Sequence, residues 1–101
     1  MFEISQGDIL QLENLKIPVL VVSKSFFNRT EQVIACPIWK TASPDPLHIP
    51  FKAEEMSGVV LCEQMKLLDL SVRGYKKISE LRYEDIINIA DAVQGIFDYY
   101  P

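Results

Sequence analysis

The chain has 101 residues, of which 49% are hydrophobic and 24% charged. This length predicts a single domain over residues 1–101, and the balance excludes extended disorder. No run reaches the roughly 18 apolar residues that can span a bilayer, and the first residues lack the pattern of a signal peptide. We therefore expect a cytoplasmic protein that does not enter a membrane. The net charge of −4 excludes a uniformly basic surface, although only the field at a groove decides whether nucleic acid binds there.

The two cysteines lie in separate apolar strand patterns and not in a paired Cys-x-x-Cys motif. We expect Cys36 and Cys62 to be buried, reduced thiols. With the only histidine, His48, they offer too few ligands for a zinc site. We therefore predict no metal and no other cofactor.

Short apolar segments separated by turn residues predict strands over most of the chain. The second predicted strand, residues 17–24, is apolar on both faces, which predicts a central position in the sheet with both faces covered. Pro37 must lie at a bulge or on an unpaired side of its strand, and Pro50 indicates an edge strand. Gly74 is predicted to close the turn after residue 69 in the left-handed conformation. The predicted strands cover residues 7–13, 17–24, 32–39, 47–51, 58–64, 66–70 and 76–81, with one helical turn at 25–28.

From about Arg82 to Tyr99 the apolar period changes to 3.6 residues, which predicts a helix. Its predicted inner face comprises Ile86, Ile89, Ala90, Val93, Ile96 and Phe97. The expected fold is mainly β (α+β), a small and strongly bent sheet of about five to seven short strands with one C-terminal helix.

Several segments occur in an order and spacing that resemble the PemK/MazF family of small bacterial toxins. They are Gly7-Asp8-Ile9, Pro18 to Ser23, Phe27-Asn28-Arg29, Val33 to Pro37, Gly58 to Gln64, Asp69 with Arg73-Gly74, and the terminal helix. The resemblance implies an SH3-like barrel, shared with the CcdB gyrase poison and usually homodimeric. It also implies the toxin of a type II toxin–antitoxin system, held in check by an antitoxin protein. Its activity would be that of a metal-free, sequence-selective endoribonuclease (mRNA interferase), in which a ribose 2′-OH attacks the adjacent phosphate.

Two positions that carry chemistry in this family differ here. The connection Asn14-Leu15-Lys16 lacks the longer loop that usually carries a cation, and Ile17 stands where a typical member has Arg. Trp39 stands where Ser or Thr is expected, while Glu63 keeps a carboxylate that typical members have. The resemblance therefore predicts a divergent active site.

That reaction needs a base, an acid and fixed positive charge at the phosphate. The predicted catalytic residues are Glu63 as base or acid, with Thr41 or His48 as the second polar group. Glu63 could instead be a strand-end carboxylate paired with Lys66, and His48 an ordinary surface residue. The predicted RNA-binding residues are Trp39, Lys40, Lys66, Arg73 and Arg29.

Three of these residues have structural alternatives. Trp39 could stack on a base, or pack at the barrel end or a dimer seam. Arg73 could hold a phosphate or form an ion pair with Asp69 that closes the turn. Arg29 could serve only to fix the helical turn.

A second function is also consistent with the sequence. A non-catalytic relative with the toxin fold would bind a peptide, an antitoxin or another macromolecule such as gyrase. The altered positions and the acidic net charge favour this alternative.

Overall fold

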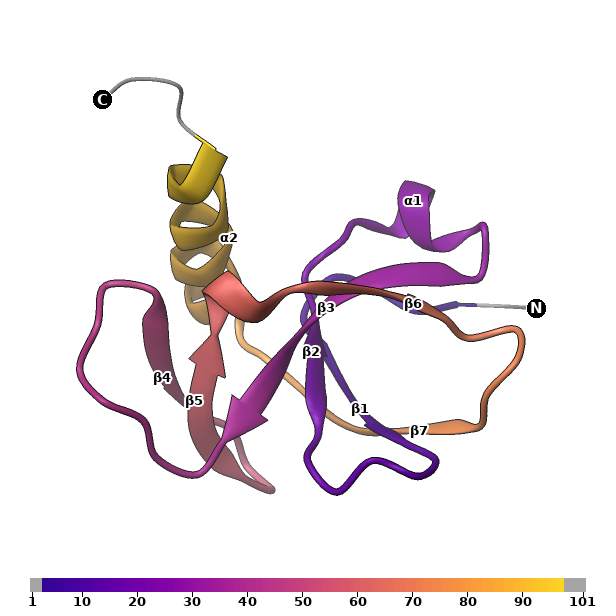
Figure 1. Cartoon of the computed structure of the whole chain (residues 1–101), viewed down its shortest axis with the longest axis horizontal. Helices are drawn as coiled ribbons and strands as arrows, with labels where there is room; N and C mark the ends of the chain where they lie inside the picture. The colour runs from indigo at the N-terminus through magenta and orange to yellow at the C-terminus, as the bar shows by residue number, and fades with distance from the viewer. Residues whose placement is uncertain (1–2, 98–101) are drawn as a thin grey trace.

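Seven strands form one strongly curled sheet in the computed structural model, which describes residues 3–97 (Figure 1). The strand order is β4-β5-β3-β2-β1-β7, and β6 pairs with β3 outside this path. This confirms the predicted mainly-β fold with a C-terminal helix. The elements are β1 Asp8–Leu12, β2 Val19–Val21, α1 Ser25–Asn28, β3 Gln32–Trp39, β4 His48–Lys52, β5 Ser57–Leu61, the 3₁₀ turn η1 Cys62–Gln64, β6 Lys66–Asp69, β7 Tyr75–Glu80 and α2 Tyr83–Phe97.

The longest strand, β3, has two different neighbours along one edge. Its residues 32–35 pair with β6, whereas Ile38 and Trp39 pair with β5. On its other edge the amide of Ile38 donates to the carbonyl of Pro18. The alternation of a strand then turns the nitrogen of Pro37 toward the point where β6 and β5 diverge. The predicted unpaired position of Pro37 is thus confirmed.

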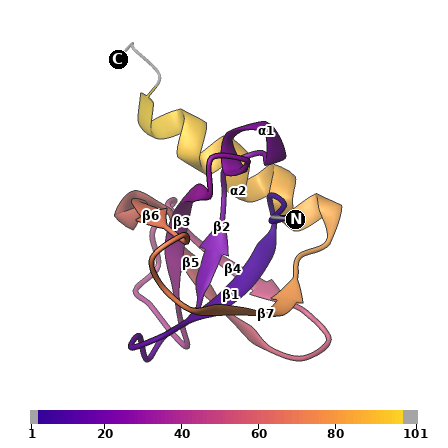
Figure 2. The same cartoon turned by 90° about the vertical axis from the view of Figure 1, so that its right-hand side faces the viewer.

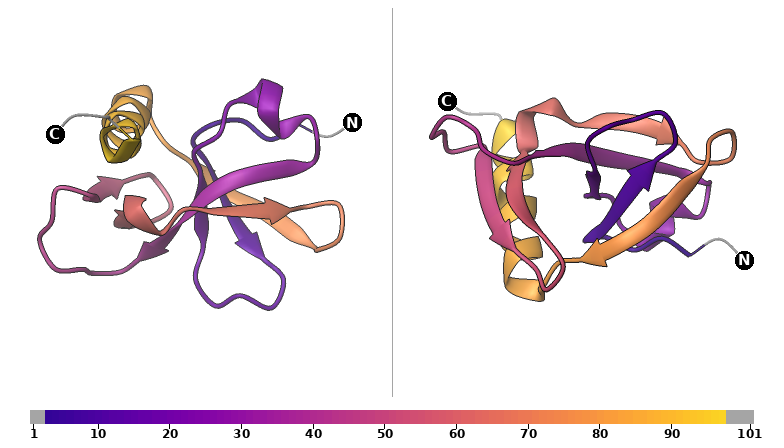
Figure 3. Two further views of the ribbon diagram at one scale, coloured as in Figure 1. Left: turned by 45° about the horizontal axis from the view of Figure 1, so that its top comes forward. Right: turned by 90° about the horizontal axis from the view of Figure 1, so that it is seen from below.

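Because the sheet curls, two hydrophobic cores form on its opposite faces. Ile9 and Leu20 belong to the core shared with β4, β5 and α2, while Leu10 and Val19 belong to the core shared with β6. β2 lies between β1 and β3, and all its residues are buried, as its apolar composition predicted. Figure 3 shows that β4 and β5 lie on one side of the curled sheet, and that β6, β1 and β7 lie on the other side.

The helix α2 runs across one end of the sheet, where it contacts η1 and β4 (Figure 2). Ile89 is buried in the first core, and Ile86 and Val93 pack against it. The predicted inner face is wrong at its end, because Ile96 and Phe97 are 38% and 68% exposed. They extend past the part of the sheet that α2 covers. The predicted helix end at Tyr99 lies outside the described residues. No helix within residues 3–97 is both long and apolar enough to cross a membrane.

Asn28 fixes α1 against the rest of the domain. Its buried side-chain amide donates to the carbonyls of Ile4 (2.8 Å) and Ser23 (3.0 Å) and accepts from the hydroxyl of Ser23. The same hydroxyl accepts a hydrogen bond from the amide of Ile34 in β3 (2.9 Å). One buried side chain therefore holds the N-terminal segment, α1 and the sheet together.

Two details of the predicted turns are wrong. The strand predicted over residues 58–64 ends at Leu61, and Cys62–Gln64 form the 3₁₀ turn η1. Gly74 is not left-handed; a side chain there would collide with the carboxylate of Glu13. The left-handed residues among those described are Gly7, Asn14 and Glu31.

Candidate active site

A histidine and a glutamate from different strands meet at one end of the β4–β5 hairpin. His48 begins β4 and pairs with Leu61, the last residue of β5. The chain then turns into η1, which brings Glu63 back beside His48. The His48 Nε2 to Glu63 Oε2 distance is 3.0 Å, and His48 Nδ1 lies 2.7 Å from the carbonyl oxygen of Ser43. Two predicted catalytic residues are thus brought together.

Both ring nitrogens of His48 face an acceptor, so the doubly protonated imidazolium satisfies both contacts. The hydrogen bond to Glu63, and secondly that to Ser43, raises the pKa of His48 above its ordinary 6.5. The same hydrogen bond lowers the pKa of Glu63. The side chains are 16% and 38% exposed, respectively. Both shifts favour the charged forms, so the contact is an ion pair when His48 is protonated, and the carboxylate is its more accessible member.

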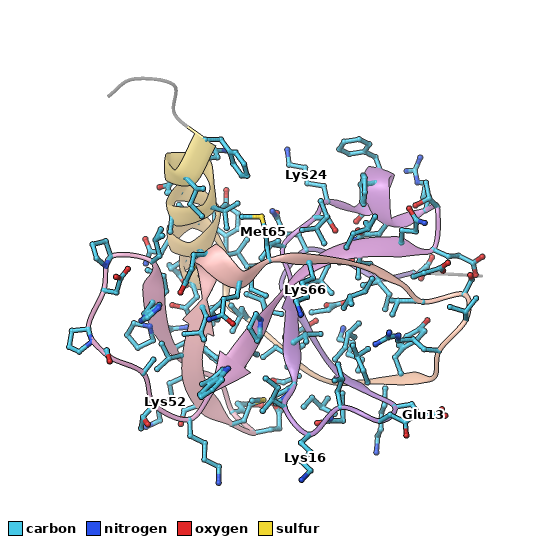
Figure 4. All side chains as sticks on the ribbon, in the orientation of Figure 1. Glu13, Lys16, Lys24, Lys52, Met65 and Lys66 are labelled. Carbon is cyan, nitrogen blue, oxygen red and sulfur yellow. The ribbon has the colours of Figure 1, made fainter. Side chains whose placement is uncertain are left out.

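A groove adjoins η1. We call it the Trp39 groove; it has a volume of about 190 Å³. It lies between the β1–β2 connection, β3 and β6, and Trp39 is 49% exposed at its wall. Gln64 lines the groove and directly follows Glu63, so η1 connects the two features. Figure 4 shows Lys66 over the middle of the sheet and Lys16 at the tip of the β1–β2 connection. The lining residues are Leu15, Ile17, Val19, Ala35, Pro37, Trp39, Gln64, Lys66 and Leu68.

Thr41 and Lys40 do not join the ion pair. Trp39 and Pro50 both pair with Val59, whereas His48 pairs with Leu61. Trp39 therefore lies two cross-strand rows further from η1 than His48. The exposed Lys40 and Thr41 continue away from that end after β3. The structure thus brings His48, not Thr41, to Glu63.

Arg29 and Arg73 lie on the opposite side of the molecule from β4. Arg29 directly follows α1, and Arg73 is exposed in the turn between β6 and β7, far from β4 (Figure 1). Asp69 accepts hydrogen bonds from the backbone and hydroxyl of Ser71. No Asp69–Arg73 or Glu63–Lys66 ion pair forms among the residues that the structure describes. Both alternative ion pairs are therefore wrong.

Sequence reasoning missed the role of Ser43 and assigned none to Gln64. No local pattern indicates that a backbone carbonyl in the 40–47 loop will face the ring of His48. For Gln64 a signal was present, since it follows Glu63 at the end of an apolar strand. The contact between Ser43 and His48 depends on the conformation of the 40–47 loop. The place of Gln64 at the site follows instead from its adjacency to Glu63 in the chain.

The two cysteines are unreactive thiols. Cys36 and Cys62 are free and buried, and burial raises their thiol pKa values to about 12 and about 11. Thiols with such pKa values stay protonated and unreactive at neutral pH. Within residues 3–97 no three His, Cys, Asp or Glu side chains are grouped so that they could hold a metal ion.

A larger, open depression of about 870 Å³ lies between residues 52–55 and 77–82. Several of its polar groups are already engaged: Lys77 bridges Asp8 and Glu80, and Ser79 donates to Glu55. Since these charges are already compensated, the depression is a weaker candidate than the His48–Glu63 pair and its groove.

The fold is that of the MazF class of toxin structures. The chain is similar to MazF of Deinococcus radiodurans, in a MazE–MazF crystal structure, with a TM-score of 0.85 and 24% identity over 96% of this chain and 98% of that one. It is also similar to an endoribonuclease from a mycobacterial species, with a TM-score of 0.84 and 20% identity over 100% and 98% of the two chains. A mycobacterial endoribonuclease in complex with its cognate antitoxin gives a TM-score of 0.82 and 19% identity over 97% and 99%.

The family follows from a sequence comparison. The family model for the PemK-like, MazF-like toxin of type II toxin–antitoxin systems matches residues 7–97. The chain belongs to the PemK/MazF family and is thus a toxin of the type II toxin–antitoxin class. A search of the curated proteins gives no match.

Proposed function

We propose that this toxin is a metal-free, sequence-selective endoribonuclease whose divergent active site is the His48–Glu63 pair. The observation that carries the proposal is the 3.0 Å contact between the two side chains beside an open groove. The similar structures described as endoribonucleases support the reaction class.

The proposed reaction uses each member of the pair once. Glu63 takes the proton of the 2′-OH on Oε1, because Oε2 is occupied by His48. The 2′-oxygen forms a bond to phosphorus, and the bond from phosphorus to the 5′-oxygen breaks. Neutralised Glu63 holds the imidazolium less strongly, so the Nε2 proton becomes available to the leaving 5′-oxygen. Return of the proton from Glu63 to His48 restores the ion pair.

The proposed RNA contacts follow from position. Trp39 and Lys66 line the groove, and Lys40 follows Trp39, so these residues are proposed to hold the RNA strand along the groove. Arg29 and Arg73 lie away from the pair and are proposed to contact only flanking RNA. Thr41 is proposed as a polar contact at the exit of β3. We also propose a homodimer and an antitoxin partner, since similar structures include MazE–MazF and endoribonuclease–antitoxin complexes.

The test is cleavage of a long unstructured RNA by purified protein in EDTA. Wild type should cut at one short motif and leave 2′,3′-cyclic phosphate ends. Glu63→Gln should reduce the rate by about 10²- to 10⁴-fold, the usual contribution of a general base. Glu84→Gln, an exposed glutamate in the first turn of α2, should cut like wild type.

Two results would contradict the proposal. Glu63→Gln that cuts as fast as wild type would remove the pair from the mechanism. Intact RNA with well-folded wild type would assign the protein to the non-catalytic binding class, which the apolar groove lining and the acidic net charge favour.

A further inference from the structure

We infer that the Trp39 groove holds one unpaired base of the RNA, stacked on Trp39, and that Gln64 determines which base is accepted. The inference rests on the proposed function for the identity of its ligand. It adds a specificity-determining residue to the site.

The size and walls of the groove fit a single flat ring. Its volume of about 190 Å³ is below the roughly 300–1,000 Å³ of pockets for larger ligands. Leu15, Ile17, Pro37 and Leu68 provide apolar walls, and the half-exposed indole of Trp39 provides a stacking surface. Every base has a face that can stack on an aromatic side chain.

The charges around the groove favour a nucleic acid over a neutral peptide or a second copy of this acidic chain. Lys66 lines the groove, Lys16 lies between the lining residues Leu15 and Ile17, and Lys40 follows Trp39. None of these three lysines forms an ion pair with any residue in the described part of the chain. Single-stranded nucleic acid is bound by this combination of aromatic platforms and cations.

Gln64 is placed to read the edge of the stacked base. It is exposed and lines the groove, and its side-chain amide makes no hydrogen bond to other residues within 3–97. A carboxamide has two donors and an acceptor, so it can form paired hydrogen bonds with a base. Because Gln64 directly follows Glu63, the base that it contacts is adjacent to the scissile bond.

Trp39 is the only tryptophan, so its fluorescence reports on the groove alone. The experiment titrates wild type with four 2′-O-methyl tetranucleotides, of A, C, G or U, which bind but cannot be cleaved. We expect saturable quenching in which one base binds at least 10-fold more tightly than the weakest. Gln64→Ala should reduce this range to about twofold, whereas Gln94→Ala on the exposed face of α2 should preserve it.

A second readout tests the stack itself. By anisotropy of a labelled tetranucleotide, Trp39→Ala should weaken binding about 5- to 150-fold, the loss expected for one base–aromatic stack, and Trp39→Phe should retain most of it. Equal affinity for all four bases, or an unchanged ranking in Gln64→Ala, would overturn the inference. Emission that responds only to protein concentration would also overturn it, since a second copy would then occupy the groove. RNA cleavage plays no part, so a Gln64-dependent ranking from a protein that cuts no RNA supports this site and rejects only the proposed activity.

Discussion

His48 is held at both ring nitrogens, and this arrangement sets the charge of the candidate site. Because it is the only histidine, its ring protons give an isolated signal in a proton NMR titration. We expect a pKa above 6.5, since the hydrogen bond to the Glu63 carboxylate and then that to Ser43 favour the imidazolium. Glu63→Gln removes the stronger contact and should lower the pKa toward 6.5.

The direction of the shift also fixes the pH dependence of cleavage. The active form has an ionised Glu63, whose pKa is lowered from 4.5, and a charged His48, whose pKa is raised from 6.5. The cleavage rate should therefore be constant at pH values between the lowered pKa of Glu63 and the raised pKa of His48. It should fall as the pH rises through the pKa of His48. An unshifted His48 in wild type, or an alkaline limb away from its measured pKa, would contradict the assigned roles.

At the scale of the elements, two glycines test how closely the sheet packs against α2, because one is crowded by a neighbouring side chain and the other is not. Gly7 has φ of +97°, and a Cβ there would lie 2.5 Å from Ile86 Cδ1. Gly95 lies in α2, and a Cβ there would meet nothing within 4 Å. Gly7→Ala should lower the free energy of unfolding by more than about 1 kcal/mol, while Gly95→Ala should raise it by about 0.5–1 kcal/mol.

Urea unfolding of the two variants beside wild type measures both changes. A neutral Gly7→Ala would show that the contact between Ile86 and the start of β1 yields without cost. A destabilised Gly95→Ala would show that α2 has a neighbour at Gly95 which the isolated chain does not provide.

The elements that the sequence predicted well are those whose side-chain pattern has a single explanation. β2 is apolar on both faces because it separates two cores, and Pro37 and Pro50 lie where a missing amide is tolerated. The predicted inner face of α2 is wrong at its C-terminal end. The apolar residues there continue the 3.6-residue period, but this part of the helix lies beyond the sheet. Ile96 and Phe97 have the right spacing but no neighbour to bury them within residues 3–97.

The candidate site was predictable in its members but not in their pairing. Glu63 was singled out by its position after an apolar strand, and His48 by its ordinary pKa. Their contact depends on β4 and β5 pairing in the register that places His48 opposite Leu61, and on η1 turning back. Neither is a local property of the sequence, and Lys66, three residues away, was the only partner of Glu63 that the sequence suggested, as an alternative to a catalytic role.

At the scale of the whole molecule, the net charge of −4 and the proposed RNA ligand are compatible only if cations are concentrated locally. Lys16, Lys40 and Lys66 adjoin the Trp39 groove without ion-pair partners among the described residues. By contrast, Lys77 is engaged by Asp8 and Glu80, away from the groove. Three such cations thus adjoin the groove of a chain whose net charge is −4, so the field that would attract RNA is local.

This distribution predicts a shallow dependence of RNA binding on salt. A single strand releases about 0.7 counterion per phosphate contacted, so three lysines give a slope of about −2 in log K against log salt concentration. Lys66→Ala should bring the slope closer to zero by about 0.7. Lys24→Ala should leave it unchanged, because Lys24 precedes α1 and is not a lining residue of the groove. The measurement is anisotropy of a labelled 2′-O-methyl hexanucleotide between 50 and 300 mM KCl. Equal effects of the two substitutions would mean that the RNA follows the general field of the protein, and a slope near zero would mean that stacking alone holds it.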